Sequence, residues 1–252
     1  MKKNIARDAP PDFERYAIAK PFFDVAYERP PTLEDALHSL SGVLVEIGAG
    51  DGQKLRHLIG DGTFASFSRI AAFDISAERI SCVRELVPEA DCVVADAAAI
   101  PLETASVDFI FSDQVIEHVP NDLEMVREMF RLTRYGGRAF VGSVIKRRGA
   151  WYFHRNAGQW RLDETHVREY SDERQFRDIF TRIGWTVKSI HTQPVAFPLD
   201  ELALRFLIKL KVFDGVAARV QSRTNPVLRR LGTFRLRIPR YDLVYAVLEK
   251  SE

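Results

Sequence analysis

The stretch that decides the fold is Val43-Leu44-Val45-Glu46-Ile47-Gly48-Ala49-Gly50-Asp51-Gly52. Val43 to Ile47 carry a single charge among aliphatic residues, which predicts a strand buried on both faces of a parallel sheet. Three glycines follow at alternate positions, where they let the backbone turn sharply and approach a ligand. Residues 53–59 then have a helical pattern, and the free N–H groups at a helix start can face that ligand. The stretch therefore predicts a nucleotide-binding corner of strand, turn and helix.

The spacing of the glycines separates two kinds of nucleotide site. A dinucleotide fingerprint, G-x-G-x-x-G/A, places its third small residue at position 53, which here is Gln53. The sequence instead reads Glu46-x-Gly48-x-Gly50-x-Gly52, and this resembles the first motif of the class I S-adenosylmethionine (SAM) methyltransferases. On the glycines alone, a nicotinamide fold or a plain glycine-rich turn stays open, because a G-x-G match is a weak signal.

Acidic residues follow the next strands of the predicted sheet. The sequence predicts five strands in this region, over residues 43–47, 69–73, 92–95, 107–111 and 138–144. The second ends on Asp74, where an acid can accept hydrogen bonds from the ribose of a nucleotide, and the third ends on Asp96. With Gln114, Glu117 and His118 after the fourth strand, the order of motifs from residue 43 to residue 144 resembles the small-molecule branch of the class I methyltransferases.

Helices with capped starts alternate with these strands, which predicts a parallel, doubly wound sheet. The resemblance implies one α/β domain over residues 1–252, with a Rossmann-like sheet of seven strands, mostly parallel with one antiparallel strand. The last two strands are expected at 186–190 and 241–248, which leaves 195–239 as a helical insertion. Residues 1–31, rich in proline and aromatic residues, are expected as an N-terminal cap over the pocket or as a strap outside the sheet.

The resemblance implies that the cofactor is SAM. The expected cofactor-binding residues lie in or directly after predicted strands: Glu46, Gly48, Gly50, Asp74, Ile75, Asp96, Ala97, Ser112 and Gln114. Glu46 and the glycine backbone suit the methionine end, Asp74 suits the ribose hydroxyls, and Ile75 suits the adenine face. Asp96 suits the adenine amino group. For either aspartate alone, an ordinary loop acid or helix cap is the alternative.

Methyl transfer to an alcohol needs an aligned acceptor, a site without water and a base for the hydroxyl proton. Two histidines are candidates for catalysis. His118 lies just past the fourth strand, and His166 lies in a polar stretch with aromatic residues upstream. A hydrogen-bonded structural histidine is the alternative for each, and His166 is the favoured base.

Glu117-His118 resembles a metal-binding pattern of the ubiquinone-pathway O-methyltransferases, which carry a further Glu three residues before the pair. Gln114 stands at that position here, and a neutral amide is a poorer ligand for a hard cation. The sequence therefore predicts no required metal. Cys82 and Cys92 form neither a C-x-x-C motif nor a disulfide framework.

The acceptor is less clearly encoded. Between Trp151 and Tyr170, aromatic residues alternate with charged ones, which suits a sugar and resembles methyltransferases of bacterial surface-glycan synthesis. The favoured function is methylation of a hydroxyl on a small molecule or glycan. A quinone or polyketide acceptor is the runner-up, and a SAM-binding module without catalysis is a third reading. A nucleic-acid substrate is disfavoured by the net charge of +1 and by Ser112-Asp113-Gln114-Val115, which lacks the Asn/Asp-Pro-Pro-Tyr/Phe motif.

Basic residues gather late in the chain. Between Leu202 and Arg240, Asp214 is the only acid, and the apolar run 202–213 has cations interspersed. The run predicts a helix packed on the sheet edge or a homodimer contact, or else a surface for anionic lipid or a phosphate-bearing acceptor. Without a signal peptide or an 18-residue apolar run, the protein is expected in the cytoplasm, with peripheral attachment at the inner face of the membrane as the further expectation.

Overall fold

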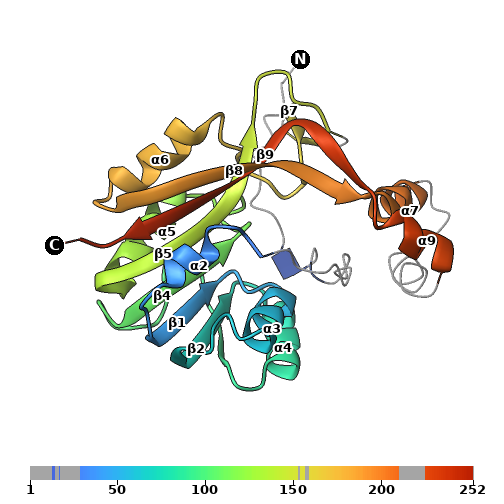
Figure 1. The fold of residues 1–252 in the computed structure, drawn as a ribbon. Coiled ribbons are helices and arrows are strands. Elements are labelled where there is room, and N and C mark those ends of the chain that lie inside the picture. The colour runs from blue at the N-terminus through green and yellow to red at the C-terminus, as the bar shows by residue number, and fades with distance from the viewer. Residues whose placement is uncertain are drawn as a thin grey trace, which may run out of the picture.

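A seven-stranded sheet forms the centre of the computed structural model, which describes residues 13, 14, 17, 29–152, 154–156, 159–209 and 225–251 (Figure 1). The strand order is β3-β2-β1-β4-β5-β9-β8. The strands are β1 (Gly42–Ile47), β2 (Phe67–Asp74), β3 (Asp91–Val94), β4 (Val107–Asp113), β5 (Thr133–Lys146), β8 (Thr186–Pro198) and β9 (Arg235–Glu249). The first five pair in parallel, and β9 runs antiparallel to both β5 and β8. One antiparallel strand in a seven-stranded sheet is the predicted arrangement.

Helices cover both faces of the sheet. They are α2 (Leu33–Leu37), α3 (Gln53–Gly60), α4 (Ala77–Leu86), α5 (Asp122–Leu132) and α6 (Glu173–Thr181). Successive side chains of a strand point to opposite faces. In β4, Ile110 packs with residues of α5 and α6, while Phe109 and Phe111 pack on the other face with residues of α2, α3 and α4. These two apolar layers confirm the doubly wound, Rossmann-like α/β fold.

The two C-terminal strands are longer than the sequence predicted. Residues 195–198 and 235–239 were assigned to a helical insertion, but 195–198 belong to β8 and 235–239 to β9. Val195 and Ile238 are buried there in a third apolar cluster with Tyr152 and Tyr241. Prolines lie at both ends of this region, and proline usually ends a strand because it cannot donate a ladder hydrogen bond. β8 nevertheless continues through the region, with only a register shift between Pro194 and Ala196.

The paired ends of β8 and β9 form a ribbon that carries α7 (Leu199–Lys209) and α9 (Pro226–Leu231) away from the sheet (Figure 1). Residues 210–224, which include part of the predicted apolar run, lie outside the described residues. A second short ribbon, β6 (His154–Asn156) with β7 (Gln159–Arg161), was not predicted. Among the described helices, none has the length and apolar character to cross a membrane.

Candidate active site

The glycine turn after β1 is held tightly against its neighbours. The backbone N–H groups of Gly48 and Ala49 both donate to the carbonyl of Phe73, at 2.7 and 3.0 Å. Gly48 has φ +76°, and a Cβ at this position would lie 2.3 Å from the side chain of Val115. Only glycine satisfies both conditions, because other residues rarely adopt positive φ and would collide here. The turn thus leads directly into α3 and keeps its backbone open at the carboxyl end of β1.

Asp74, the last residue of β2, is fixed by two backbone donors. Its Oδ2 accepts from the N–H of Gly50 at 2.9 Å, and its Oδ1 accepts from the N–H of Ser76 at 3.0 Å. Burial raises the pKa of this carboxyl group, although the two hydrogen bonds and Arg79 act in the opposite direction. A carboxylate oxygen can accept a further bond. Asp74 is therefore oriented toward the glycine turn, as its predicted role requires.

The adenine side of the predicted site is more open. Ile75 is 50% exposed directly after Asp74. Asp96 is exposed, and its Oδ1 accepts from the N–H of Ala98 at 2.8 Å. Ala97 is half-buried against the core. β2 and β3 pair in parallel, so these residues lie at the same edge of the sheet as the glycine turn.

Glu46 carries a buried carboxyl group below the glycine turn. It is 2% exposed, and its Oε2 has no hydrogen-bond partner among the described residues. Burial raises its pKa to about 8, with Lys54 acting against that change. Lys54 itself donates to the Asp113 side chain at 2.8 Å and to the Asp113 carbonyl at 2.9 Å. Lys54 and Asp113 were not predicted as site residues, although a lysine in the first turn of a helix after a glycine loop is a recognisable signal.

The two polar residues predicted after β4 differ in their positions. Ser112 is fully buried, and its Oγ donates to the carbonyl of Ile47 at 3.0 Å. It therefore ties β4 to β1 and does not line the crevice, contrary to its prediction. Gln114 has φ +63°, its N–H donates to the carbonyl of Gly142, and its Nε2 lies 3.5 Å from Oδ1 of Asp113. Gln114 thus remains the cofactor candidate at this strand end.

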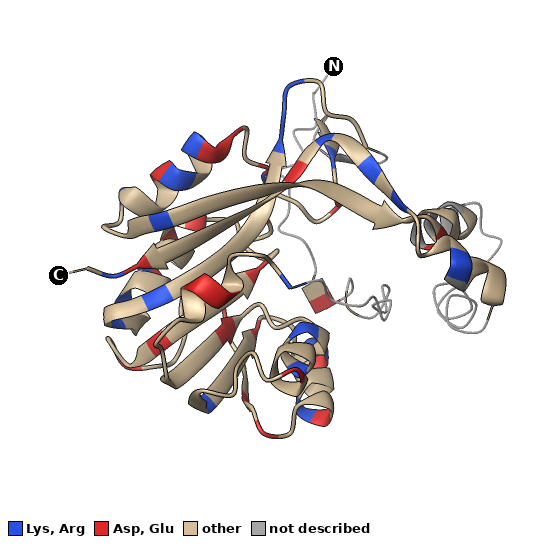
Figure 2. Cartoon of the chain, viewed as in Figure 1, with Lys and Arg blue, Asp and Glu red and all other residues tan. Residues whose placement is uncertain are grey.

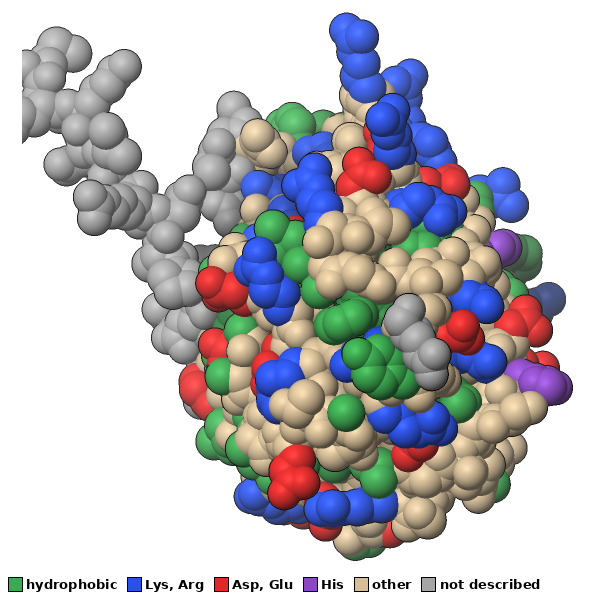
Figure 3. Space-filling view, turned by 90° about the vertical axis from the view of Figure 1, so that its left-hand side faces the viewer, with side chains coloured by type: hydrophobic (Ala, Val, Ile, Leu, Met, Phe, Trp, Pro, Cys, Tyr) green, Lys and Arg blue, Asp and Glu red, His purple; other side chains and the backbone are tan. Residues whose placement is uncertain are grey.

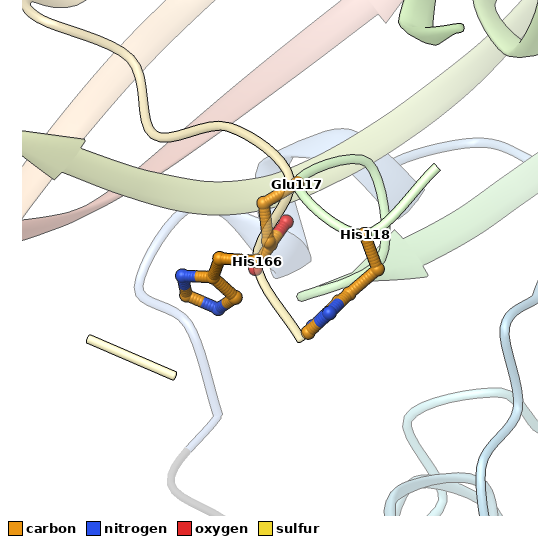
Figure 4. Close-up of side chains that lie close together, drawn as sticks. All are labelled: Glu117, His118 and His166. Atoms are coloured by element: carbon orange, nitrogen blue, oxygen red, sulfur yellow. The ribbon is translucent and has the colours of Figure 1, made fainter. Parts of the chain in front are cut away.

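Past β4, the structure brings Glu117, His118 and His166 together (Figure 4). The rings of His118 and His166 meet edge to face, with centroids 4.8 Å apart. Nδ1 of His118 lies 2.9 Å from Oγ1 of Thr165, and Nδ1 of His166 lies 2.9 Å from Oε1 of Glu169. The two predicted catalytic histidines, from loops far apart in the sequence, therefore share one site.

Arg168 fastens these two loops to each other. Its guanidinium donates to the carbonyls of Ile116, Val119 and Pro120, and its backbone N–H donates to the carbonyl of Glu117. Hydrogen bonds to a charged donor are stronger than neutral ones. The position of His166 beside Glu117 is thus supported from outside the site.

Burial dominates the electrostatics of this cluster. It lowers the pKa of His118 to about 3, and the neighbouring His166 adds to the effect. Burial also raises the pKa of Glu117. Burial alone would lower the pKa of His166, but Glu169 and Glu117 outweigh it and raise the pKa. His118 is therefore neutral near neutral pH, whereas His166 holds a proton more readily than a free histidine.

Oε1 of Glu117 and Nε of Arg161 are buried and have no hydrogen-bond partner among the described residues. Oε2 of Glu169 lies 3.7 Å from Nζ of Lys146, with which it forms an ion pair. The pKa of Tyr241 is raised by burial and by Glu169, which places the two side chains next to each other. Buried polar groups without a protein partner usually bind water or a ligand. This region is suited to a polar ligand.

Part of the N-terminal segment lies over the site. The ring of Phe13 meets His118 edge to face, with centroids 6.2 Å apart. The carboxylate of Glu14 accepts from the hydroxyl of Ser76 at 3.0 Å and from the N–H of Ala77 at 2.5 Å. Phe13 thus contacts His118 and Glu14 contacts the start of α4, while the N-terminal cap as a whole stays a prediction. The remainder of the predicted cap up to residue 28, apart from residue 17, lies outside the described residues.

Comparison with known proteins agrees with this geometry. Residues 45–141 match the family described as "Methyltransferase domain". The chain is 32% identical over 114 residues to the biotin biosynthesis bifunctional protein BioHC of Cellvibrio japonicus. The matched region is 43% of this chain and 22% of that protein. It is 34% identical over 100 residues to the "Probable S-adenosylmethionine-dependent methyltransferase" of Mycolicibacterium smegmatis, which covers 40% and 37%.

Among solved structures, the YcgJ protein of a Bacillus species matches with a TM-score of 0.61 at 14% identity, over 88% of this chain and 97% of that one. A likeness at this identity concerns the fold. The matches cover between 22% and 51% of the length of the curated relatives. The family match lies on the strands and turns that build the site, and it supports a class I S-adenosylmethionine-dependent methyltransferase domain over residues 45–141.

Proposed function

We propose that this protein transfers the methyl group of SAM to a hydroxyl group of a small molecule or glycan. The observation that carries the proposal is the placement of two kinds of site at one edge of the sheet. The glycine turn with Asp74 lies after β1 and β2, and the pair His118 and His166 lies after β4. A methyl donor held at the first and an acceptor held at the second would lie next to each other.

The cofactor is held in this proposal by the edge formed from β1 to β4. Asp74 accepts the ribose hydroxyls, and Ile75 packs on the adenine, whose amino group donates to Asp96. The carboxyl group of Glu46, buried and without a partner, faces the amino group at the methionine end. Lys54, in the first turn of α3, adds a cation near the methionine carboxylate.

The proton of the acceptor hydroxyl goes to His166. As the new C–O bond forms, the bond from the methyl carbon to sulfur breaks, and neutral S-adenosylhomocysteine leaves. The O–H proton passes to Nε2 of His166, because Nδ1 is already engaged with Glu169 at 2.9 Å. The carboxylate fixes the orientation of the ring and stabilises the imidazolium that forms, as in other carboxylate–histidine pairs.

A sugar acceptor is favoured by the aromatic residues of the segment that precedes His166. Trp151 and Trp160 are exposed, and their ring centroids lie 5.9 Å apart. Flat apolar faces of this kind suit sugar rings, and the buried Oε1 of Glu117 and Nε of Arg161, which have no hydrogen-bond partner among the described residues, suit hydroxyl groups. Tyr152 and Tyr170, which belong to the same aromatic stretch between residues 151 and 170, are buried in the core, and Phe153 of that stretch lies outside the described residues.

The test is an acceptor screen with radiolabelled SAM. Purified protein is incubated with glycans, lipid-linked sugars, quinones and polyketides, and label transfer is counted. Labelled glycan or lipid-linked sugar supports the proposal, whereas labelled quinone would replace it with the lipid-like acceptor. Tight SAM binding with no more than a fraction of a turnover on every acceptor would favour a non-catalytic SAM-binding module.

A further inference from the structure

We propose that Glu117, His118 and His166 form a binding site for one divalent transition-metal ion of the zinc or iron(II) type. One ligand atom from each of the three residues lies within 4.8 Å of the other two. The residues come from two loops, and in Figure 4 the two imidazole rings lie on either side of the Glu117 carboxylate. Two histidines and one carboxylate are the ligand set of catalytic zinc sites and of non-haem iron(II) sites.

Each of the three residues has one ligand atom left to bind an ion. Oε2 of Glu117 accepts from the hydroxyl of Ser143 at 2.9 Å, while Oε1 is buried and has no partner among the described residues. Nδ1 of each histidine is engaged, which leaves Nε2 as the remaining ligand atom of each ring. A bound ion would occupy the lone pair of Nε2 of His166, so this atom can act as the base for the acceptor hydroxyl only in the ion-free protein. A buried carboxylate oxygen without a partner is costly. A cation is a group that would satisfy it.

The side chains that hold the two imidazole rings are of the kind found around metal-bound histidines. Metal-bound histidines usually use their other ring nitrogen to contact a carboxylate or another polar group, which fixes the ring and its tautomer. Glu169 does this for His166, and the hydroxyl of Thr165 does it for His118, each at 2.9 Å. Arg168 holds the two loops together. These hydrogen bonds therefore restrain the two rings close to the orientation that an ion requires.

The distances require only a small closure. Ligand atoms of one tetrahedral zinc ion are about 3.3 Å apart. Ligand atoms up to 4.8 Å apart can reach this spacing by modest rotation of the side chains. Magnesium and calcium prefer an all-oxygen shell, so they fit this ligand set poorly.

Gln114 does not take part, because its amide lies toward Asp113. The third ligand is His166, which lies 48 residues beyond His118 and which the sequence pattern could not indicate. Three protein ligands leave a coordination position open toward the acceptor side. Only the catalytic role of that open coordination position rests on the proposed function. Ion binding itself does not depend on SAM or on an acceptor.

The test uses the full chain without an affinity tag, freed of metal with a chelator. Zinc chloride is titrated in by calorimetry, and cobalt(II) chloride is followed by its visible absorption. We expect one ion per chain, unaffected by excess magnesium. His118→Ala, His166→Ala and Glu117→Gln should each weaken binding more than about 100-fold. Glu169→Gln should weaken it about 10–100-fold, as the loss of a group that orients a metal-bound histidine does. His57→Ala, on α3, is the matched control and should bind like the unchanged protein.

Glu117→Gln keeps the shape of the side chain, so it decides the question if a histidine variant does not fold, and thermal unfolding of every variant shows which do. Failure of the unchanged protein to take up one ion, or equal binding by folded Glu117→Gln, would overturn the site. In that case SAM binding and methyl transfer would be untouched. Conversely, an inactive protein that still takes up zinc through these residues would overturn the proposed function and leave the metal site standing.

Discussion

The N–H of Gly50 donates to Oδ2 of Asp74 at 2.9 Å, so the glycine turn after β1 and the acid at the end of β2 are one structural unit. The second oxygen is held by Ser76. This arrangement orients the carboxylate before a ligand binds, which reduces the entropy lost on binding. It also means that a change at Asp74 affects the turn as well as the ligand.

Asp74→Ala should weaken SAM binding strongly. Two hydrogen bonds to a charged group, lost together, correspond to about 3–6 kcal/mol before solvent compensates. Isothermal titration with SAM measures the change. Asp91→Ala is the matched control, because Asp91 lies at the opposite end of β3 and pairs with Arg69. Unchanged affinity in Asp74→Ala would show that the ribose lies elsewhere.

Glu46→Gln should change how stability depends on pH. The carboxyl group ionises near 4.5 in the unfolded chain and near 8 in the fold. Between these values the unfolded chain has lost a proton that the folded chain keeps, so rising pH favours unfolding by up to about 1.4 kcal/mol per pH unit. The loss is absent below pH 4.5 and complete above pH 8.

Denaturant unfolding at several pH values, in the protein without SAM, measures this effect. The free energy of unfolding of the unchanged protein should fall relative to Glu46→Gln as the pH rises from 5 to 8. A constant difference between the two proteins across that range would mean that Glu46 is ionised in the fold at all these pH values.

His166→Ala should leave SAM affinity intact and reduce turnover about 10²–10⁴-fold, because it removes the acceptor of the hydroxyl proton. Glu169→Gln should reduce turnover less, since the ring remains but loses its carboxylate. Steady-state rates with an acceptor from the screen provide the measurement. A full rate in His166→Ala, together with a collapse in His118→Ala, would move the role to His118.

The ribbon and its insertion should bind anionic membranes. Arg230, Arg235 and Arg237 lie on this arm with Phe234 and Leu236, which are 61% and 52% exposed (Figure 2). Each cation near an anionic surface contributes about 1 kcal/mol, an effect that fades with salt. Co-sedimentation with anionic vesicles should succeed at low salt and fail at high salt or with neutral vesicles.

Replacing the basic residues of the arm should abolish this binding; they are Arg229, Arg230, Arg235 and Arg237, each changed to Gln. A control set with the same change in charge takes exposed arginines of α5, α6 and the turn after α6: Arg127, Arg174, Arg177 and Arg182. Figure 3 shows charges of both signs mixed over one face of the molecule. A general effect of net charge on vesicle binding is therefore the alternative explanation that the control set tests. If both sets lose vesicle binding equally, or if the protein stays in the supernatant under every condition, the arm does not bind membranes. It would then serve in packing or as a subunit contact, and light scattering would distinguish these two by the size of the particle in solution.

The edge of the sheet that holds the proposed site could be predicted because local patterns encode it. Glu46 to Gly52 carries its own turn chemistry, and parallel strands bring Asp74 and Asp96 to one edge whatever lies between them. Ser112 was placed wrongly because the strand was expected to end at residue 111. β4 continues to Asp113, so Ser112 still lies inside the sheet.

The histidine cluster could not be predicted from the sequence, although both histidines were chosen. Its geometry depends on the backbone bonds from Val167 and Arg168 to the carbonyl of Glu117, which link loops about fifty residues apart. No local pattern encodes such a contact. The orientation of His166 by Glu169 is also a matter of loop shape, because a spacing of three residues brings side chains together in a helix but carries no such meaning in a loop.

The place of β9 between β5 and β8 has a consequence for how the chain is made. Both neighbours are synthesised before the strand that joins them. Until β9 emerges, β5 and β8 each present an unpaired edge, the kind of surface that recruits other strands in error. The ribbon that carries the insertion also cannot form before β9 is made, because Ala196 to Pro198 pair with residues of β9. Translation of this half of the protein therefore runs ahead of its folding, and the nascent chain depends on whatever shields those edges until the strand arrives.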